Sequence, residues 1–83
     1  MTIRGRVQGV GFRYSAAERA RSRGLAGWIR NNADGTVEAV FEGPPDAVEA
    51  LLAWCRRGPG GARVDDLRVE MEAPSGESGF RAI

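Results

Sequence analysis

Hydrophobic residues recur along this chain at two spacings, and the first of them predicts strands. Between residues 2 and 7, small or apolar side chains alternate with arginines, which is the period of a half-buried strand. Residues 36–42 and 64–72 alternate in the same way. Shorter apolar runs predict two further strands at residues 25–30 and 80–83.

The second spacing, of three to four residues, predicts two helices. Residues 12–23 place Phe12, Ala16 and Ala20 on one face, and the small alanines indicate that this helix lies close to a sheet. The second helix opens at Pro44–Asp46, because proline is tolerated in a first turn. Its expected core-facing stripe consists of Val48, Leu51, Leu52 and Cys55.

The order of these elements is β-α-β-β-α-β with a short terminal strand. It predicts an α+β fold, the ferredoxin-like α/β sandwich, in which an antiparallel sheet carries two helices on one face. The Asp34-Gly35 turn joins two strands into a hairpin. In the strand at 64–72 we expect Leu67, Val69 and Met71 to face inward. The sequence has no internal linker or repeat, so we expect one domain, residues 1–83.

The charged residues exclude several kinds of chemistry. Twelve basic and eleven acidic residues give a formal charge of +1, which does not indicate a general nucleic-acid surface. Every basic residue is arginine, and histidine is absent. A Ser-His-Asp triad, a Schiff-base lysine and the lysine of a Walker nucleotide loop are therefore excluded.

The single cysteine, Cys55, limits both redox and metal chemistry. It has no partner for an intramolecular disulfide, and a zinc site of the usual kind needs more cysteine or histidine. We expect Cys55 to be a buried small apolar residue. No apolar run approaches membrane-spanning length, and the first residues lack a signal-peptide core. We therefore expect a cytoplasmic protein with no membrane association.

The segment Gly5–Arg13 has the pattern of an anion-binding loop: a strand, a glycine-bearing turn and a helix start. The first N–H groups of a helix have no partner inside it, and the helix dipole adds positive charge there. The planar guanidinium of Arg13 matches two phosphate oxygens. The pattern also allows a plainer interpretation, in which Gly9 and Gly11 only make a tight connection and Arg13 is solvated.

Asn31 is the second candidate, at the end of a strand just before the hairpin turn. Its carboxamide carries a donor and an acceptor, so it can hold a water molecule, although it is not a strong base. Ordinary turn chemistry would also favour asparagine at this place.

Together the two segments resemble the acylphosphatase family. The first matches the family loop Gly-x-Val-Gln-Gly-Val-x-Phe-Arg, and the second, Gly27–Val37, matches the family hairpin Gly-Trp-(Val/Ile)-x-Asn…Gly-Thr-Val. The resemblance extends to the Glu42–Pro44 step and to the strand at Phe80, and so spans essentially the whole chain. One departure is Asn32, where several relatives carry threonine, and we assign it no role.

The resemblance implies the hydrolysis of acyl phosphates without metal, cofactor or covalent intermediate. It implies that Arg13 binds the phosphoryl group and that Asn31 positions the attacking water. The residues implied to bind the substrate, mainly through their amides, are Gln8, Gly9, Val10, Gly11, Phe12 and Arg13. We expect a monomer whose partner is a small acyl phosphate.

Three other interpretations fit part of the sequence pattern. An RNA-binding module shares this fold but needs aromatic residues on the open sheet face. Here we expect that face to lack aromatics and to carry Arg4, Arg6, Glu38, Val40, Glu42, Arg68 and Glu70. A second alternative is the acylphosphatase-like domain of hydrogenase-maturation carbamoyltransferases. We expect a free-standing enzyme instead, because the sequence stops at Ile83 without zinc-finger cysteines. The third is an inactive relative, but both key residues are present.

Overall fold

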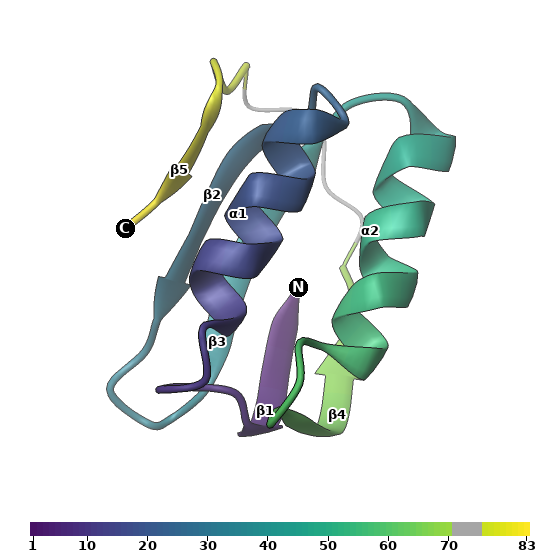
Figure 1. The fold of residues 1–83 in the computed structure, drawn as a ribbon. Helices are drawn as coiled ribbons and strands as arrows, with labels where there is room; N and C mark the ends of the chain where they lie inside the picture. The colour runs from purple at the N-terminus through teal and green to yellow at the C-terminus, as the bar shows by residue number, and fades with distance from the viewer. Residues whose placement is uncertain (71–75) are drawn as a thin grey trace.

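All predicted helices and strands form, in the predicted order (Figure 1). The computed structural model describes residues 1–70 and 76–83. The elements are β1 (Thr2–Arg6), α1 (Phe12–Ser22), β2 (Ala26–Asn31), β3 (Val37–Glu42), α2 (Pro45–Arg57), β4 (Arg63–Arg68) and β5 (Phe80–Ala82).

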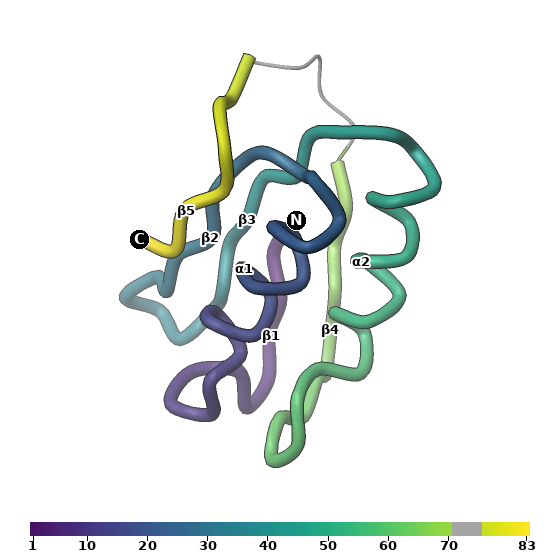
Figure 2. The backbone as a smooth tube through the Cα atoms, turned by 45° about the horizontal axis from the view of Figure 1, so that its top comes forward, coloured from purple at the N-terminus to yellow at the C-terminus, as the bar shows by residue number. Residues whose placement is uncertain are grey.

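The strands make one sheet in the order β4-β1-β3-β2-β5, and both helices cover the same face (Figures 1 and 2). The pairs β1·β4, β1·β3 and β2·β3 are antiparallel, as predicted. The short β5 pairs with β2 in parallel, which makes the sheet mixed. The ferredoxin-like α+β class is confirmed, with β5 added at the β2 edge. Neither helix in the described part of the chain is long and apolar enough to cross a membrane.

The strand predicted at residues 64–72 ends earlier than expected. β4 stops at Arg68, and Val69, which we predicted to face inward, is 40% exposed. The reason lies in β1, whose first residue, Thr2, is already the partner of Arg68. Met1 bonds instead to Ala39 of β3, through its amino group and its carbonyl, both at 3.0 Å. Leu67 packs against the core as predicted.

The predicted inward position of Met71 and the end of that strand at Glu72 lie outside the described residues.

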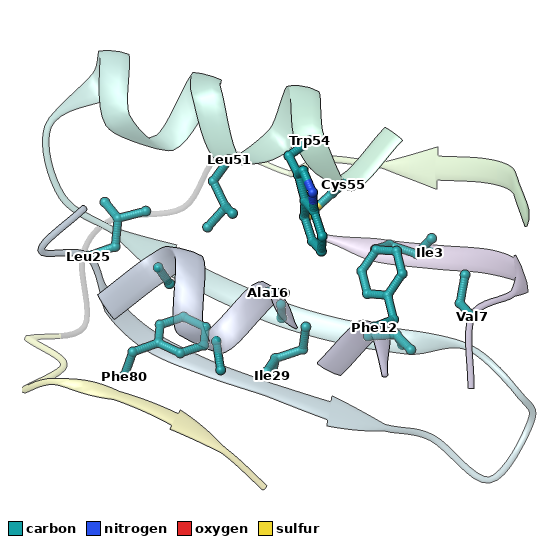
Figure 3. Packing of buried hydrophobic residues seen from close by; sticks show 14 residues of the cluster. Ile3, Val7, Phe12, Ala16, Leu25, Ile29, Leu51, Trp54, Cys55 and Phe80 are labelled. Atoms are coloured by element: carbon teal, nitrogen blue, oxygen red, sulfur yellow. The ribbon is translucent and has the colours of Figure 1, made fainter. Parts of the chain in front are cut away.

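The core lies between the sheet and the helices (Figure 3). The α1 residues Ala16 and Ala20 are completely buried, so their small side chains let the helix approach the sheet closely. Phe12 packs against Trp54 of α2 with ring centroids 5.4 Å apart. Cys55 is fully buried, as predicted, and burial raises the pKa of its thiol to about 12. This thiol therefore stays protonated and serves as a core side chain.

The open face of the sheet carries an aromatic residue that we did not predict there. In β2, Gly27 and Ile29 are buried, so the alternating residue Trp28 lies on the face without helices. The guanidinium carbon of Arg30 lies 5.0 Å from the centre of the Trp28 ring. The expectation of an open face without aromatics was wrong at Trp28, because the short apolar run at 25–30 does not reveal its face.

Candidate active site

The loop between β1 and α1 is held at both ends by the core. Val7 and Phe12, on either side of it, are 2% and 1% exposed. Between them Gly9 and Gly11 have φ angles of 75° and 77°, in the left-handed region that L side chains rarely adopt. Two buried anchors and two glycines therefore give this loop its shape.

The start of α1 leaves a row of main-chain donors without acceptors. Within the described residues, the N–H groups of residues 8–13 donate to no acceptor, and the first helical bond at this end runs from Ser15 N to Gly11 O, at 3.0 Å. The first turn has no acidic residue and no side-chain cap. These donors and the positive end of the helix dipole suit an anion.

The guanidinium of Arg13 is held at the same end of α1. Its Nη1 donates to the main-chain oxygen of Ile83 at 2.6 Å, and its Nη2 donates to the hydroxyl of Tyr14 at 3.2 Å. Its Nε is buried and has no hydrogen-bond partner among the described residues. A buried donor without a partner is costly, so a ligand oxygen at this point would be favourable.

Asn31 is the last residue of β2, and its side chain is exposed. Its place in the alternation, after the buried Gly27 and Ile29, puts it on the face of the sheet that the helices cover. Its carboxamide makes no hydrogen bond within the described residues. Both its donor and its acceptor are available to a ligand or to water.

Two hydrogen-bonded links bring the loop and Asn31 together. On one side, Gln8 Nε2 donates to the carbonyls of Asn32 and Thr36, at 2.8 and 2.9 Å. On the other, the N–H of Ile83 donates to Ile29 O at 2.8 Å, and the carbonyl of Ile83 accepts from Arg13. The loop and the β2–β3 turn consequently lie at the same end of the molecule (Figures 1 and 2).

The other predicted loop residues differ in what they can offer. Gly9 and Gly11 are exposed, and Val10 is half-buried and packs against the core. The side chain of Phe12 is in the core, so only its main-chain N–H can reach a ligand. Gln8 uses its side chain to hold the hairpin, which leaves its N–H for binding.

The profile of the Acylphosphatase family matches residues 1–82. The chain belongs to the acylphosphatase family. The acylphosphatase of Thermococcus kodakarensis is 53% identical over 83 residues, which cover 100% of this chain and 91% of that protein. The crystal structure of the acylphosphatase from Bacillus subtilis superposes with a TM-score of 0.93 at 37% identity, covering 99% of this chain and 92% of that chain. Hydrolysis of acyl phosphates is the function of the family.

A second kind of solved structure also resembles this chain. Full-length HypF, crystallised in the phosphate- and nucleotide-bound form, matches with a TM-score of 0.89 at 28% identity. The match covers 99% of this chain but 11% of the HypF chain. The acylphosphatase fold therefore also occurs as a small part of a much longer protein.

Sequence reasoning missed the polar network of the hairpin turn next to Asn31. The carboxylate oxygen Oδ1 of Asp34 accepts from the Thr36 N–H at 3.0 Å and from the Thr36 hydroxyl at 2.6 Å. Asn32 Nδ2 donates to the Thr36 hydroxyl at 3.0 Å. Thr36 is only 2% exposed, so these bonds satisfy a buried polar group. The signal in the sequence was Asp followed two residues later by Thr, the pattern of an Asx turn.

Two carboxylates of the hairpin titrate below their ordinary range. The hydrogen bond from the Thr36 hydroxyl is the main cause that lowers the pKa of Asp34 from 3.8. The hydrogen bond from Arg30 is the main cause that lowers the pKa of Glu38 from 4.5. The folded protein therefore stabilises the ionised form of both groups more than the protonated form.

These shifts predict an acid-dependent loss of stability. Because both pKa values are lower in the folded state, the two carboxylates stabilise the fold above 3.8 and 4.5, and this stabilisation is lost as the pH falls through the lower folded values. Because Asp34 is exposed and Glu38 is partly exposed, we expect a small decrease in Tm below pH 4.5, and a smaller one in an Asp34→Asn, Glu38→Gln double variant. Calorimetry across this range measures both slopes. Equal slopes in the parent and the variant would contradict the assignment.

A separate groove of about 640 Å³ lies between the two helices. It is lined by Ser15, Glu18, Arg19 and Ser22 of α1, Trp54 and Arg57 of α2, and Gly58, Pro59 and Gly60. The guanidinium of Arg19 covers the Trp54 ring at 4.7 Å. Neither Arg13 nor Asn31 lines this groove, so it is not part of the candidate active site.

Proposed function

We propose that this chain hydrolyses acyl phosphates, with Arg13 holding the phosphoryl group and Asn31 positioning the attacking water. The observation that carries the proposal is the buried Nε of Arg13, close to the N–H groups at the start of α1. Neither has an acceptor among the residues that the structure describes, and hydrogen bonds link both to the hairpin of Asn31. A phosphate would accept hydrogen bonds from these donors, which protein groups do not satisfy in the described part of the chain.

The phosphoryl group binds to the amides of Gln8–Arg13 and to the guanidinium of Arg13. Its negative oxygens complement the positive end of the α1 dipole and the arginine charge. In the transition state of phosphoryl transfer, negative charge is spread over these same oxygens. The donors that bind the phosphoryl group therefore also stabilise the transition state. Arg13 therefore serves in binding and in catalysis.

Asn31 holds a water molecule in line with the leaving oxygen. The water oxygen forms a bond to phosphorus, while the bond between phosphorus and the acyl oxygen breaks and releases a carboxylate. A carboxylate is a good leaving group, so the step needs no general acid, which fits a sequence without histidine. The proton of the water passes to the substrate phosphate. Catalysis then comes from positioning and charge stabilisation, without a metal, a cofactor or a covalent intermediate.

The active form in this proposal is a cytoplasmic monomer acting on a small molecule. The loop, Arg13 and the hairpin of Asn31 are joined by hydrogen bonds within the chain, which supports a site built without residues of a second copy.

Release of inorganic phosphate from benzoyl phosphate by the purified chain tests this function. We expect turnover that EDTA does not reduce and that added inorganic phosphate inhibits competitively, raising KM at unchanged kcat, because phosphate occupies the same donors. Carbamoyl phosphate serves as a second substrate, because it also carries a carbonyl group bonded to a phosphate oxygen. Absence of phosphate release from both compounds, by a chain with native circular dichroism, would contradict the proposed function.

A further inference from the structure

The two chain neighbours of Asn31 are both fastened to one carboxylate oxygen. Oε1 of Glu38 accepts from Arg30 Nη2 at 2.8 Å and from Arg30 Nε at 3.3 Å. The same oxygen accepts from Asn32 Nδ2 at 3.3 Å. Since Arg30 and Asn32 directly precede and follow Asn31, one carboxylate is hydrogen-bonded to the side chains on both sides of it.

Glu38 is well placed for this because it sits on a central strand. Its Cα pairs with Arg30 of β2 and with Thr2 of β1, so β3 is supported on both edges at this position. The Arg30 guanidinium also covers the Trp28 ring, at 5.0 Å. The Glu38 carboxylate therefore comes from a strand that is paired on both sides, and it bonds to side chains at the less supported end of β2.

The main-chain support of Asn31 itself is limited. Asn31 pairs with Val37 in the last register position of β2 and β3, and β5 ends opposite Ile29, at Ala82. The turn follows immediately. The main-chain pairing of β2 with β3 ends at Asn31, and the bonds of Glu38 on the open face add support there. The Asn31 carboxamide itself lies on the other face.

We propose that Glu38 is a positioning residue that holds Asn31 in its reactive geometry. The inference rests on the proposed role of Asn31. Glu38 lies on the open face and acts through Arg30 and Asn32, without touching the substrate. Rates are sensitive to small displacements of a group that aligns the reactants, so loss of this support lowers turnover even though bonds between exposed groups add little stability.

Glu38→Ala tests the proposal against a matched control on the same face. Glu38→Ala is expected to lower kcat for benzoyl phosphate about tenfold, with the inhibition constant of inorganic phosphate changed less than about twofold. Glu38→Gln retains an acceptor oxygen and should recover most of the rate. The control is Asp66→Ala, which removes a carboxylate bonded to Arg68 at 3.1 Å on another strand. It should leave kcat at the parental value.

A double-mutant cycle with Asn31→Ala separates positioning from a structural role. In the Asn31→Ala background, Glu38→Ala should change kcat less than about twofold, because the group that it positions is gone. A full additional loss in that background, or a parental kcat for the single variant, would overturn the proposal. If Glu38→Ala fails to fold, Asn32→Ala removes one of the bonds and replaces it in the cycle.

The same measurements distinguish this inference from the proposed function. A parental rate for Asn31→Ala alone would refute the assigned role of Asn31, and this inference with it. A slow Asn31→Ala together with a parental Glu38→Ala would refute the positioning role of Glu38 alone.

Discussion

Replacing Arg13 with alanine is expected to lower kcat/KM for benzoyl phosphate by about a thousandfold or more, since single groups that stabilise transferring phosphoryl oxygens contribute on that scale. Inorganic phosphate should also stop competing at concentrations that inhibit the parent. The reason is that the variant loses the guanidinium charge and the buried Nε donor, which has no hydrogen-bond partner in the described part of the chain. Phosphate release and inhibition by added phosphate measure the two effects.

Arg13→Lys is the control that separates charge from geometry. It keeps a cation but loses the planar fork, so we expect only a small part of the lost activity to return. Both variants also lose the Nη1 bond to Ile83 O, so their melting curves are recorded to confirm that each is folded at the assay temperature. Alanine-substituted enzyme with parental activity would remove Arg13 from the mechanism.

The second large effect is expected for Asn31→Ala, which should lower kcat by two to three orders of magnitude, roughly the loss seen when one positioning donor is removed. The affinity for inorganic phosphate should be largely retained, because the phosphate ligands are on the loop and on Arg13. Steady-state kinetics on benzoyl phosphate, with phosphate as the inhibitor, separates kcat from binding. Hydrolysis at the parental rate would show that Asn31 does not position the water.

Asn31→Asp is the matched control, because it keeps the shape of the side chain and changes its charge. It preserves size but replaces the amide donor by a negative oxygen close to the bound phosphate. We therefore expect slow turnover together with a weaker affinity for phosphate, which Asn31→Ala should not show. Equal phosphate affinities in the two variants would argue against a position beside the phosphoryl group.

Most of the fold could be predicted from the sequence because its elements are determined by nearby residues. The alternation around Val37 and the alanine spacing of α1 are local patterns, and both were confirmed. The end of β4 was not predictable from its own alternation, because it depends on Thr2 and Met1, which are distant in the sequence. The face of Trp28 was missed for a similar reason, since a short apolar run does not state which side meets the helices.

The candidate site also has one part that nearby residues determine and one part that depends on distant segments. The loop and Arg13 are predictable from contiguous residues, because glycines before a helix start produce an anion site by local geometry. The hydrogen bond from Arg13 to Ile83 depends on the parallel pairing of β5 with β2. No local sequence pattern predicts this pairing. The side-chain bonds of Gln8 and Glu38 also join segments that meet only in the folded sheet.

The bond between Arg13 and Ile83 has a consequence for folding. It joins residues 70 positions apart, whereas the β2–β3 hairpin and α1 are built from local contacts. Contacts that close long loops are entropically costly, so they slow folding more than local ones do. The bond from Arg13 to Ile83 can form only when the edge strand β5 has docked on β2. During refolding we therefore expect catalytic activity to return after the helices have formed.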